Sequence, residues 1–271
     1  MRSYKIEREP RPRSPTSGWP GSVFCAFSFL IYLLLFALAS ASCVEPPKAE
    51  PKTITVMVVV LDLSPSTVVD LRCDELSARV RQMLGAPGVK RLDVMAVGTG
   101  EGPTGMEPIV LVRWSRWDPK GKLYEQPGQA DAARDAWAES VRATCHESLR
   151  ATRSSPIFAA VKRGAESIRA HCKEIEGRRE RCDRQFLFIH SDLRENVEPP
   201  IAERLLSETR GKPVTDAKPI PRIDVGGVEL AICGVSNTRL SVGEKYISPS
   251  ALSSAWSEVL GPNTPSFDSS C

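Results

Sequence analysis

Apolar runs separated by amphipathic segments extend through most of the chain. Residues 53–62 (TITVMVVVLD) are almost continuously apolar and β-branched, which is typical of a strand buried on both faces, and residues 185–192 (QFLFIHSD) form a second such run. Both runs end in an acidic residue. Residues 91–100 and 228–235 predict two more strands, and the alternating segment 108–117 predicts a strand or a hairpin.

Apolar residues recur at helical spacing between these strands. In the segment 68–84 they are Val69, Leu76, Val80 and Leu84, which places them on one face of a helix. The same reasoning predicts a short helix near 202–206 and longer helices over 129–149, 156–172 and 248–260. Two tryptophans lie on the apolar stripes of these helices and are expected in the core: Trp137 and Trp256.

The alternation of strands and helices predicts an α/β fold. We expect a doubly wound, mostly parallel central sheet with helices on both faces, in a single domain over residues 53–262 that is followed by a tail at 263–271. In such a sheet, ligands bind beyond the carboxyl ends of the strands. The acidic residues that end the two buried runs, Asp62 and Asp192, would both lie at that edge.

The N-terminal part of the chain predicts a membrane address. Residues 1–22 form a basic leader, residues 23–43 carry no charge, and residues 44–52 form a Pro-rich tether. Because the positive charge precedes the apolar segment, we expect the domain on the extracytoplasmic side of the cell envelope. Three readings stay open: a bacterial lipoprotein signal with lipidation at Cys43, an uncleaved membrane anchor, or a cleaved signal peptide.

Charge is balanced in the rest of the chain. The leader holds five of the 36 Lys and Arg residues and two of the 33 Asp and Glu residues, which leaves 31 of each sign. A chain with balanced charge has no net positive potential to attract the phosphate backbone of a nucleic acid, so nucleic acid is not an expected partner.

Six cysteines follow Cys43, an even number that suits an oxidising compartment. They allow 15 pairings. Cys172 and Cys182 bracket nine polar residues (KEIEGRRER) that we expect to connect a helix end to a strand start, and we predict a disulfide between them. A zinc–thiolate site is not expected, because the chain contains no Cys-x-x-Cys pair.

Candidate chemistry gathers where the first strand ends. The sequence Asp62-Leu-Ser64-Pro-Ser66 supplies a carboxylate and two hydroxyls, and ligands that are all oxygen suit a hard cation such as Mg²⁺. With this motif the chain resembles von Willebrand factor type A domains, whose metal-ion-dependent adhesion site begins in the same way. Two later pieces follow in the family's order: Ser155 before Pro156-Ile157, where the family usually has Thr, and Ser191-Asp192 after a buried strand.

The resemblance implies a Rossmann-like fold and a specific set of metal ligands. Mg²⁺, or Mn²⁺ or Ca²⁺ in its place, would be held directly or through water by Asp62, Ser64, Ser66, Ser155 and Asp192. The remaining coordination position would take an acidic group from a protein partner. A cation that is held by few full charges stays electrophilic, so this chemistry serves recognition and requires no turnover. We therefore expect a binding protein and not an enzyme.

Three other functions are alternatives to this one. The same fold without metal would make a structural or assembly component of the cell envelope. A haloacid-dehalogenase-like phosphatase would use Asp62 as nucleophile, but it needs a second Asp where this chain has Ser64. A serine hydrolase is disfavoured because Gly-x-Ser-x-Gly is absent.

The remaining residues of note have structural interpretations. His146 and His171 lie near predicted helix ends and are expected to be solvated or to interact with the helix dipole. His190 is expected to be packed or hydrogen-bonded beside the site. Trp114 and Trp117 could form either an exposed contact patch or simple packing at the sheet edge.

Overall fold

The computed structural model describes residues 52–63, 71–100, 107–119, 128–149, 156–194, 201, 219–234 and 249–261. All of them belong to one compact unit, Pro51–Cys271. Within the described part, none of the helices combines the length and the apolar character that crossing a membrane requires. The leader, the apolar segment 23–43, Cys43, the short helix predicted near 202–206 and the tail lie outside the described residues.

Five strands form a single sheet in the order β3-β2-β1-β4-β5. Their bounds are β1 (Lys52–Leu61), β2 (Leu92–Gly98), β3 (Ile109–Trp117), β4 (Glu180–His190) and β5 (Glu229–Cys233). All neighbouring pairs are parallel except β2 with β3. Because the strand order reverses between β1 and β4, the sheet is doubly wound and this pair marks its topological switch point. The predicted fold class is confirmed.

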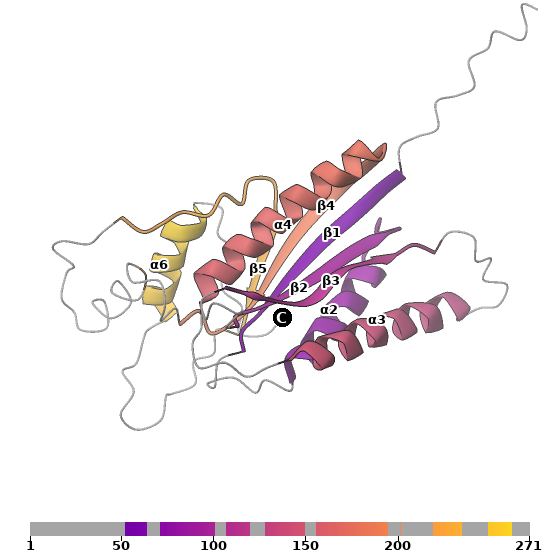
Figure 1. Ribbon diagram of the computed structural model, residues 1–271, viewed down its shortest axis with the longest axis horizontal. Coiled ribbons are helices and arrows are strands. Elements are labelled where there is room, and N and C mark those ends of the chain that lie inside the picture. The colour runs from indigo at the N-terminus through magenta and orange to yellow at the C-terminus, as the bar shows by residue number, and fades with distance from the viewer. Residues whose placement is uncertain are drawn as a thin grey trace, which may run out of the picture. The chain divides into compact units, whose positions relative to one another are not determined.

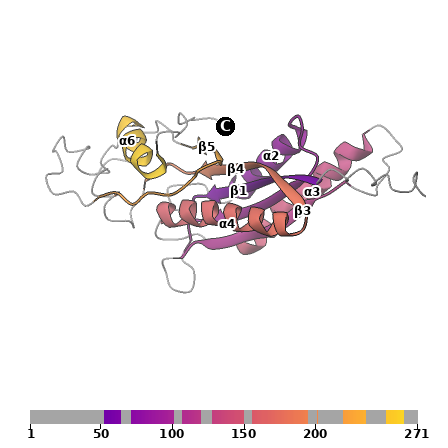
Figure 2. The ribbon, with the colours of Figure 1, turned by 90° about the horizontal axis from the view of Figure 1, so that it is seen from above.

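Helices cover both faces of the sheet. In Figure 1, α4 (Ile157–Gly177) lies over one face, while α2 (Arg72–Gly85) and α3 (Gln129–Ser148) lie over the other, and Figure 2 shows the same layers from above. The last helix, α6 (Pro249–Leu260), shares the core of α4.

The central position of β1 in the sheet explains why its sequence is a continuous apolar run. Val56, Val58 and Val60 face the core formed with α4 and α6, whereas Met57 and Val59 face the core formed with α2 and α3. Side chains of a strand alternate between its two faces, so a central strand needs apolar residues at every position.

The segment between Cys172 and Cys182, which was expected to be a polar loop, consists mostly of helix and strand. α4 continues to Gly177 and β4 begins at Glu180, so a short turn replaces the expected polar loop. The helix continues because Ile175 extends the buried stripe of Ile168 and Cys172. β4 begins early because Glu180 and Arg181 pair with the start of β1.

The predicted Cys172–Cys182 disulfide is present and joins α4 to β4, with a Cα–Cα distance of 5.3 Å. A second disulfide, Cys73–Cys145, joins α2 to α3 across 72 residues of chain. Cys233 is disulfide-bonded as well. All five cysteines of the described residues are therefore cross-linked, which agrees with the expected oxidising compartment.

Both predicted core tryptophans pack inward. Trp256 of α6 is fully buried, and Trp137 of α3 is partly buried against the core. Trp117 of β3 packs on Trp137 with ring centroids 5.9 Å apart, so for this residue the interpretation as edge packing holds. Trp114 stacks on His171 and lines a groove.

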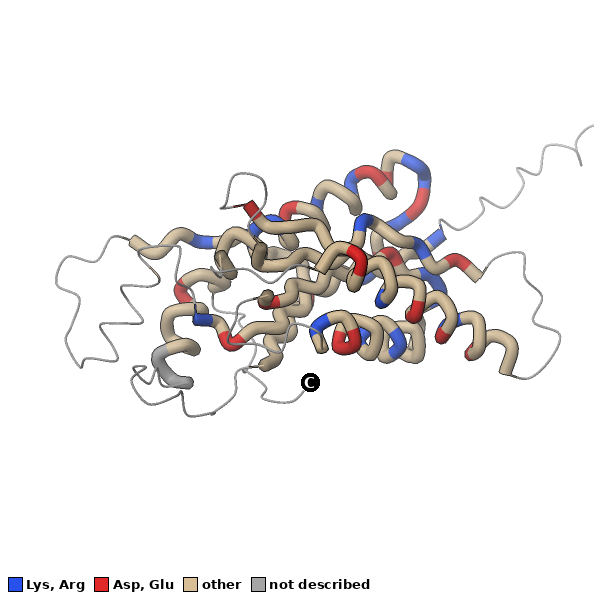
Figure 3. Tube along the Cα trace, turned by 60° about the horizontal axis from the view of Figure 1, so that its bottom comes forward, with Lys and Arg blue, Asp and Glu red and all other residues tan. Residues whose placement is uncertain are grey.

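Acidic and basic residues are interspersed along α2, α3 and α4, and Figure 3 shows both signs scattered along the described trace. Several of these charges form surface ion pairs, among them Arg142 with Glu139 and Arg134 with Asp131. The described surface therefore shows the mixed charge that the sequence indicated.

Gly164 provides a sensitive test of the packing between α4 and the sheet. A Cβ atom at this position would lie 2.9 Å from Leu187 Cδ1 and 3.2 Å from Val58 Cγ1. We expect Gly164→Val to lower the free energy of unfolding by about 2 kcal/mol, because the larger side chain overpacks the core. Urea unfolding would measure this. Gly177→Val is the matched control, since nothing lies within 4 Å of its Cβ position; equal losses in both variants would contradict the packing argument.

Candidate functional site

The carboxyl ends of three neighbouring strands bring polar residues together at the switch point. Asp62 follows β1, and its backbone N–H donates to the carbonyl of His190, the last residue of β4, at 2.9 Å. The backbone N–H of Thr99, after β2, donates to the carbonyl of Leu61, also at 2.9 Å. Ser191 follows β4. The sheet therefore places Thr99, Asp62 and Ser191 side by side, with Asp62 in the middle.

Two hydroxyls hold the Asp62 carboxylate. Thr99 Oγ1 donates to Asp62 Oδ1 at 3.1 Å, and Ser191 Oγ donates to Asp62 Oδ2 at 2.9 Å. All three side chains are fully buried. A buried carboxylate is tolerated where its oxygens accept hydrogen bonds, so the two hydroxyls fix the position of Asp62 and offset its loss of hydration.

The same hydroxyls also fix the start of the loops that follow. Thr99 Oγ1 accepts a hydrogen bond from the backbone N–H of Leu63, and Ser191 Oγ accepts one from the N–H of Leu193, both at 2.9 Å. Each hydroxyl has a single proton, which it gives to Asp62, and uses a lone pair for the backbone. Asp62 is thereby connected to the first residues of the loops after β1 and β4.

The loop after β4 is held at a second point. Leu193 is buried and has a positive φ of 60°, a conformation that is uncommon for residues other than glycine. Trp256 Nε1 of α6 donates to the Leu193 carbonyl at 3.0 Å. The tertiary structure therefore keeps this loop in a conformation that its sequence alone would not favour.

Asp192 lies in this loop, directly after Ser191, and is mostly buried. Its Oδ1 accepts a hydrogen bond from the backbone N–H of Arg194 at 3.1 Å, and its Oδ2 lies 3.5 Å from Arg194 Nε. The structure thus brings Asp62 and Ser191 into direct contact and places Asp192 next to them in the chain. Three other predicted ligands, Ser64, Ser66 and Ser155, lie outside the described residues.

A cationic side chain borders the site on the side of α2. Arg72 is buried at the first turn of this helix, and its Nε donates to the Asp62 carbonyl at 3.2 Å. Its Nη1 donates to Glu75 Oε2 at 2.7 Å and lies 3.0 Å from His190 Nδ1. Glu75 balances the guanidinium, so the backbone around Asp62 is anchored without a net positive charge from this pair.

His190 is a neutral neighbour of the site at pH 7. Burial lowers its pKa from 6.5 to about 4; the nearby Glu75 raises the pKa, and Arg72 and Arg79 lower it. A neutral imidazole can accept the Arg72 hydrogen bond at Nδ1. The expectation that His190 is packed and hydrogen-bonded beside the site agrees with these contacts.

The lowered pKa of His190 predicts a pH dependence of stability. The contribution of neutral His190 to the free energy of unfolding is complete above about pH 6.5 and is lost as the pH falls toward about 4. In this range the unfolded chain binds a proton at the histidine and the folded chain does not. We expect a loss of about 2–3 kcal/mol over this range. Chemical unfolding between pH 4 and 7.5 would measure it. His190→Gln should show a flatter profile, and an unchanged profile in that variant would contradict the assignment to His190.

The other two histidines differ from each other. His146, in the last turn of α3, is exposed and 4.0 Å from Asp74, which agrees with the expected surface position. The expectation for His171 is wrong. His171 is buried, with Nε2 2.7 Å from Asp93 Oδ2 and its ring stacked on Trp114. It lies on the buried side of α4 together with Ile168 and Ile175, and it is not at the helix end because α4 continues to Gly177.

The described residues suit a divalent cation in one respect, their oxygen chemistry at the sheet edge. They contain no group of three His, Cys, Asp or Glu side chains that could hold a metal. The oxygen chemistry at the sheet edge fits a hard cation, because carboxylate and hydroxyl oxygens are the ligands that Mg²⁺ takes in proteins. Asp62, which is held in place by hydrogen bonds, would therefore contact a cation through water. The hydroxyls of the predicted motif would ligate it directly.

Comparisons with known proteins found similar solved structures. No protein-family model matches the chain, and no curated protein matches it. An aerotolerance-related membrane protein from Bacteroides fragilis is 13% identical, with a TM-score of 0.36, over 78% of this chain and 92% of that chain. The manganese-loaded TRAP protein of Plasmodium vivax is 11% identical, with a TM-score of 0.38, over 82% and 68%. BatB from Bacteroides thetaiotaomicron is 9% identical, with a TM-score of 0.35, over 78% and 91%.

Likeness at this level carries no argument about function. The assignment of the fold rests on the sheet itself: its order, its antiparallel edge strand and the acidic residue at its switch point. These features agree with the von Willebrand factor type A-like architecture that the sequence motifs imply.

Two residues of this site were absent from the predicted ligand set. Thr99 was not considered, and Ser191 was recognised only as part of the Ser-Asp motif, although both bind Asp62 directly. The signal was present: each follows a buried parallel strand at its carboxyl end, as Asp62 does. Only the strand order shows that the three strands are neighbours.

Proposed function

We propose that this protein is a binding module that recognises an acidic group of a protein partner through a divalent cation at the carboxyl edge of its sheet. The observation that carries the proposal is the position of Asp62, which is fully buried at the switch point and held by the hydroxyls of Thr99 and Ser191. An open α/β sheet binds its ligands at this place.

In this proposal the hydroxyls of Ser64, Ser66 and Ser155 and the carboxylates of Asp62 and Asp192 hold Mg²⁺, directly or through water. Mn²⁺ or Ca²⁺ would use the same oxygen ligands. When bound, the cation supplies an electrophilic centre for the partner's carboxylate. Thr99 and Ser191 keep Asp62 in one orientation, and Trp256 keeps the loop of Asp192 in place. The module needs no catalytic step.

The proposed setting is the outer side of a membrane. Residues 23–43 would direct export, and Cys43 would carry a lipid in the lipoprotein reading. The disulfides of the domain support this setting, since such bonds persist in oxidising compartments. Metabolic labelling with a fatty-acid probe, compared between the wild type and Cys43→Ser, tests the lipid attachment.

A metal-free structural role is the second candidate, and one observation favours it. Both oxygens of Asp62 already accept hydrogen bonds from protein hydroxyls, so the site is satisfied without a cation. In this case the polar cluster only fixes the loops at the sheet edge, and the protein acts as an assembly component of the envelope.

Thermal unfolding with and without divalent cations separates the two candidates. We expect Mg²⁺ or Mn²⁺ to raise the Tm of the full chain, because a ligand that binds only the folded state stabilises it. The rise should disappear in Ser64→Ala and Ser66→Ala and persist in the control Ser140→Ala, on the exposed side of α3. No rise in the wild type at millimolar cation would reject the metal site and favour the structural role.

Partner recognition is tested by pull-down from envelope extracts with and without chelator. A partner that is retained with Mg²⁺ and released by EDTA supports the proposal when Ser64→Ala fails to retain it. Hydrolysis of a generic phosphate ester that is abolished by Asp62→Asn would instead point to the phosphatase alternative.

A further inference from the structure

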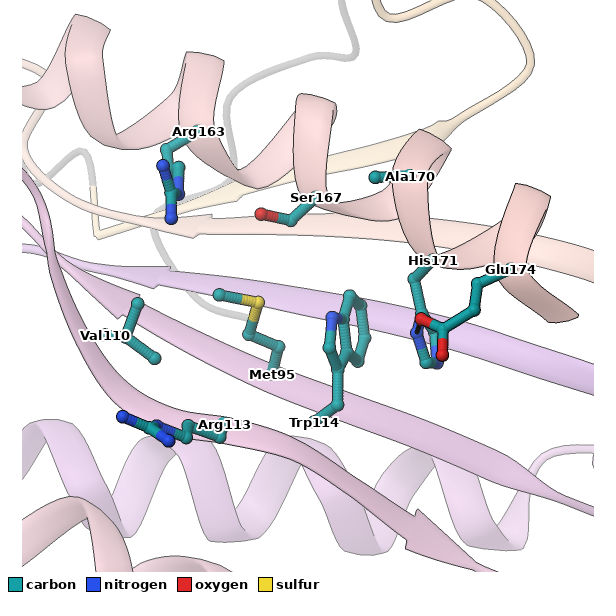
Figure 4. Close-up of a pocket in the computed structure, with 9 residues that line it drawn as sticks. All are labelled: Met95, Val110, Arg113, Trp114, Arg163, Ser167, Ala170, His171 and Glu174. Atoms are coloured by element: carbon teal, nitrogen blue, oxygen red, sulfur yellow. Dashed lines mark ion pairs between the residues drawn. The ribbon is translucent and has the colours of Figure 1, made fainter.

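A groove lies beside β3, away from the carboxyl edge of the sheet. β3 is an edge strand that pairs with β2 on one side, and α3 packs on one of its faces. On the opposite face α4 packs over β4, β1 and part of β2. Between the side of α4 and strands β2 and β3 remains a cavity of about 570 Å³. Figure 4 shows side chains of both strands and of α4 facing this space.

The floor of the groove is apolar and aromatic. It contains Met95 of β2 with Val110 and Trp114 of β3. Val110 and Trp114 are only partly buried, whereas Met95 is buried. An apolar side chain placed on this floor would remove further apolar surface from water, which favours binding.

Two arginines face the groove from opposite sides. Arg113 comes from β3 and Arg163 from α4, and both are exposed. Within the described residues neither forms an ion pair or a hydrogen bond. Other arginines of the same elements do: Arg116 of β3 binds Asp93, and Arg169 of α4 pairs with Asp224. The groove therefore presents two guanidinium groups that are available to an anion.

One end of the groove is rigid. The Trp114 ring stacks on His171 with centroids 3.9 Å apart and an angle of 9° between the planes. His171 Nε2 lies 2.7 Å from Asp93 Oδ2, and Asp93 binds Arg116 through both oxygens. Glu174, the acidic residue of the lining, pairs with Arg178 and lies 3.8 Å from His171 Nδ1. Its charge is thus compensated locally, and the uncompensated charge of the groove is positive.

We infer that this groove binds an acidic segment of a partner protein. The segment would place carboxylates on Arg113 and Arg163 and an adjacent apolar side chain against Val110 and Trp114. A carboxylate suits this place because guanidinium groups form charge-assisted hydrogen bonds with it. A polypeptide segment suits it because the groove runs along the side of a helix next to an edge strand, and because both arginines remain open to solvent.

Fluorescence polarisation with a labelled peptide tests the inference. The probe is a short peptide of sequence Gly-Glu-Phe-Glu-Gly, measured against the full chain in the presence of EDTA, so that a cation site makes no contribution. We expect saturable binding and a loss of at least about tenfold in affinity for Arg163→Glu and Arg113→Glu. Lys162→Glu is the matched control, because it makes the same charge change at an exposed neighbour outside the lining and should keep wild-type affinity.

Three results would overturn the inference. The first is equal binding of the amide peptide Gly-Gln-Phe-Gln-Gly, since the carboxylates would then be irrelevant. The second is wild-type affinity in both arginine variants. The third is displacement of the peptide by phenylacetate at equal concentration, which would assign the groove to a small aryl carboxylate. Binding that appears only with Mg²⁺ and vanishes in Ser64→Ala belongs to the proposed metal site, so failure of one proposal is distinguishable from failure of the other.

Discussion

Replacing Asp62 with alanine is expected to lower the free energy of unfolding by about 3 kcal/mol and to abolish any stabilisation by Mg²⁺. The substitution removes the acceptor of two buried hydroxyls, Thr99 Oγ1 and Ser191 Oγ. A buried polar group that loses its partner costs about 1–3 kcal/mol. The loss should therefore appear in EDTA as well as in Mg²⁺, because it arises from the protein's own hydrogen bonds.

Urea unfolding of the wild type and of Asp62→Ala in both conditions measures this effect. Asp131→Ala is a suitable control, since this carboxylate is exposed in a surface pair with Arg134 and its removal should cost less than about 1 kcal/mol. A loss within that limit for Asp62→Ala in EDTA would show that the hydroxyl contacts add little. Ser64→Ala provides the complementary variant, since it tests the cation and leaves the hydroxyls of Thr99 and Ser191 in place.

The second large effect is expected at Asp93, near the opposite end of the sheet. Burial raises the pKa of this carboxyl, but hydrogen bonds from His171 and Arg116 lower it more, so the net pKa lies below its ordinary value of 3.8. Asp93 is 2% exposed and binds Arg116 Nε and Nη2 at 2.7 and 2.8 Å. Asp93→Asn removes the negative charge that both partners face.

We expect Asp93→Asn to lower the free energy of unfolding by about 3 kcal/mol or more, because removal of one member of a buried charge network leaves the others uncompensated. The contribution of Asp93 is present above pH 3.8 and is lost as the pH falls below it, so the wild type and the variant should converge in acid. Urea unfolding at pH 7 and pH 3 measures both differences.

Asp135→Asn is the matched control, because Asp135 is 64% exposed and pairs with Arg81 at the surface. Equal losses for the two variants at pH 7 would contradict the role of burial. Asp93→Asn should also weaken peptide binding in the groove less than Arg163→Glu does, since Asp93 positions His171 and Trp114 but does not line the cavity.

The local pattern of the sequence predicted most of the elements and the fold class. The run from residue 53 to 62 required a strand covered on both faces, and β1 has such cover because its valines alternate between two cores. The Cys172–Cys182 pair could be predicted because the two cysteines bracket a short segment between a helix and the following strand. Element ends were less predictable: α4 extends to Gly177 because Ile175 meets the core, which depends on a helix–sheet contact and not on local polarity.

By itself the sequence determined that two buried strands end in acidic residues and that hydroxyls lie nearby in the chain. This was possible because the local pattern of apolar and polar residues predicts which strands are buried. Only the tertiary structure decided that Thr99 and Ser191 flank Asp62, that His171 is buried against Trp114 and Asp93, and that Arg113 and Arg163 face one groove. These contacts join residues far apart in the chain. Strand order and helix placement create them, and both follow from how the whole core packs.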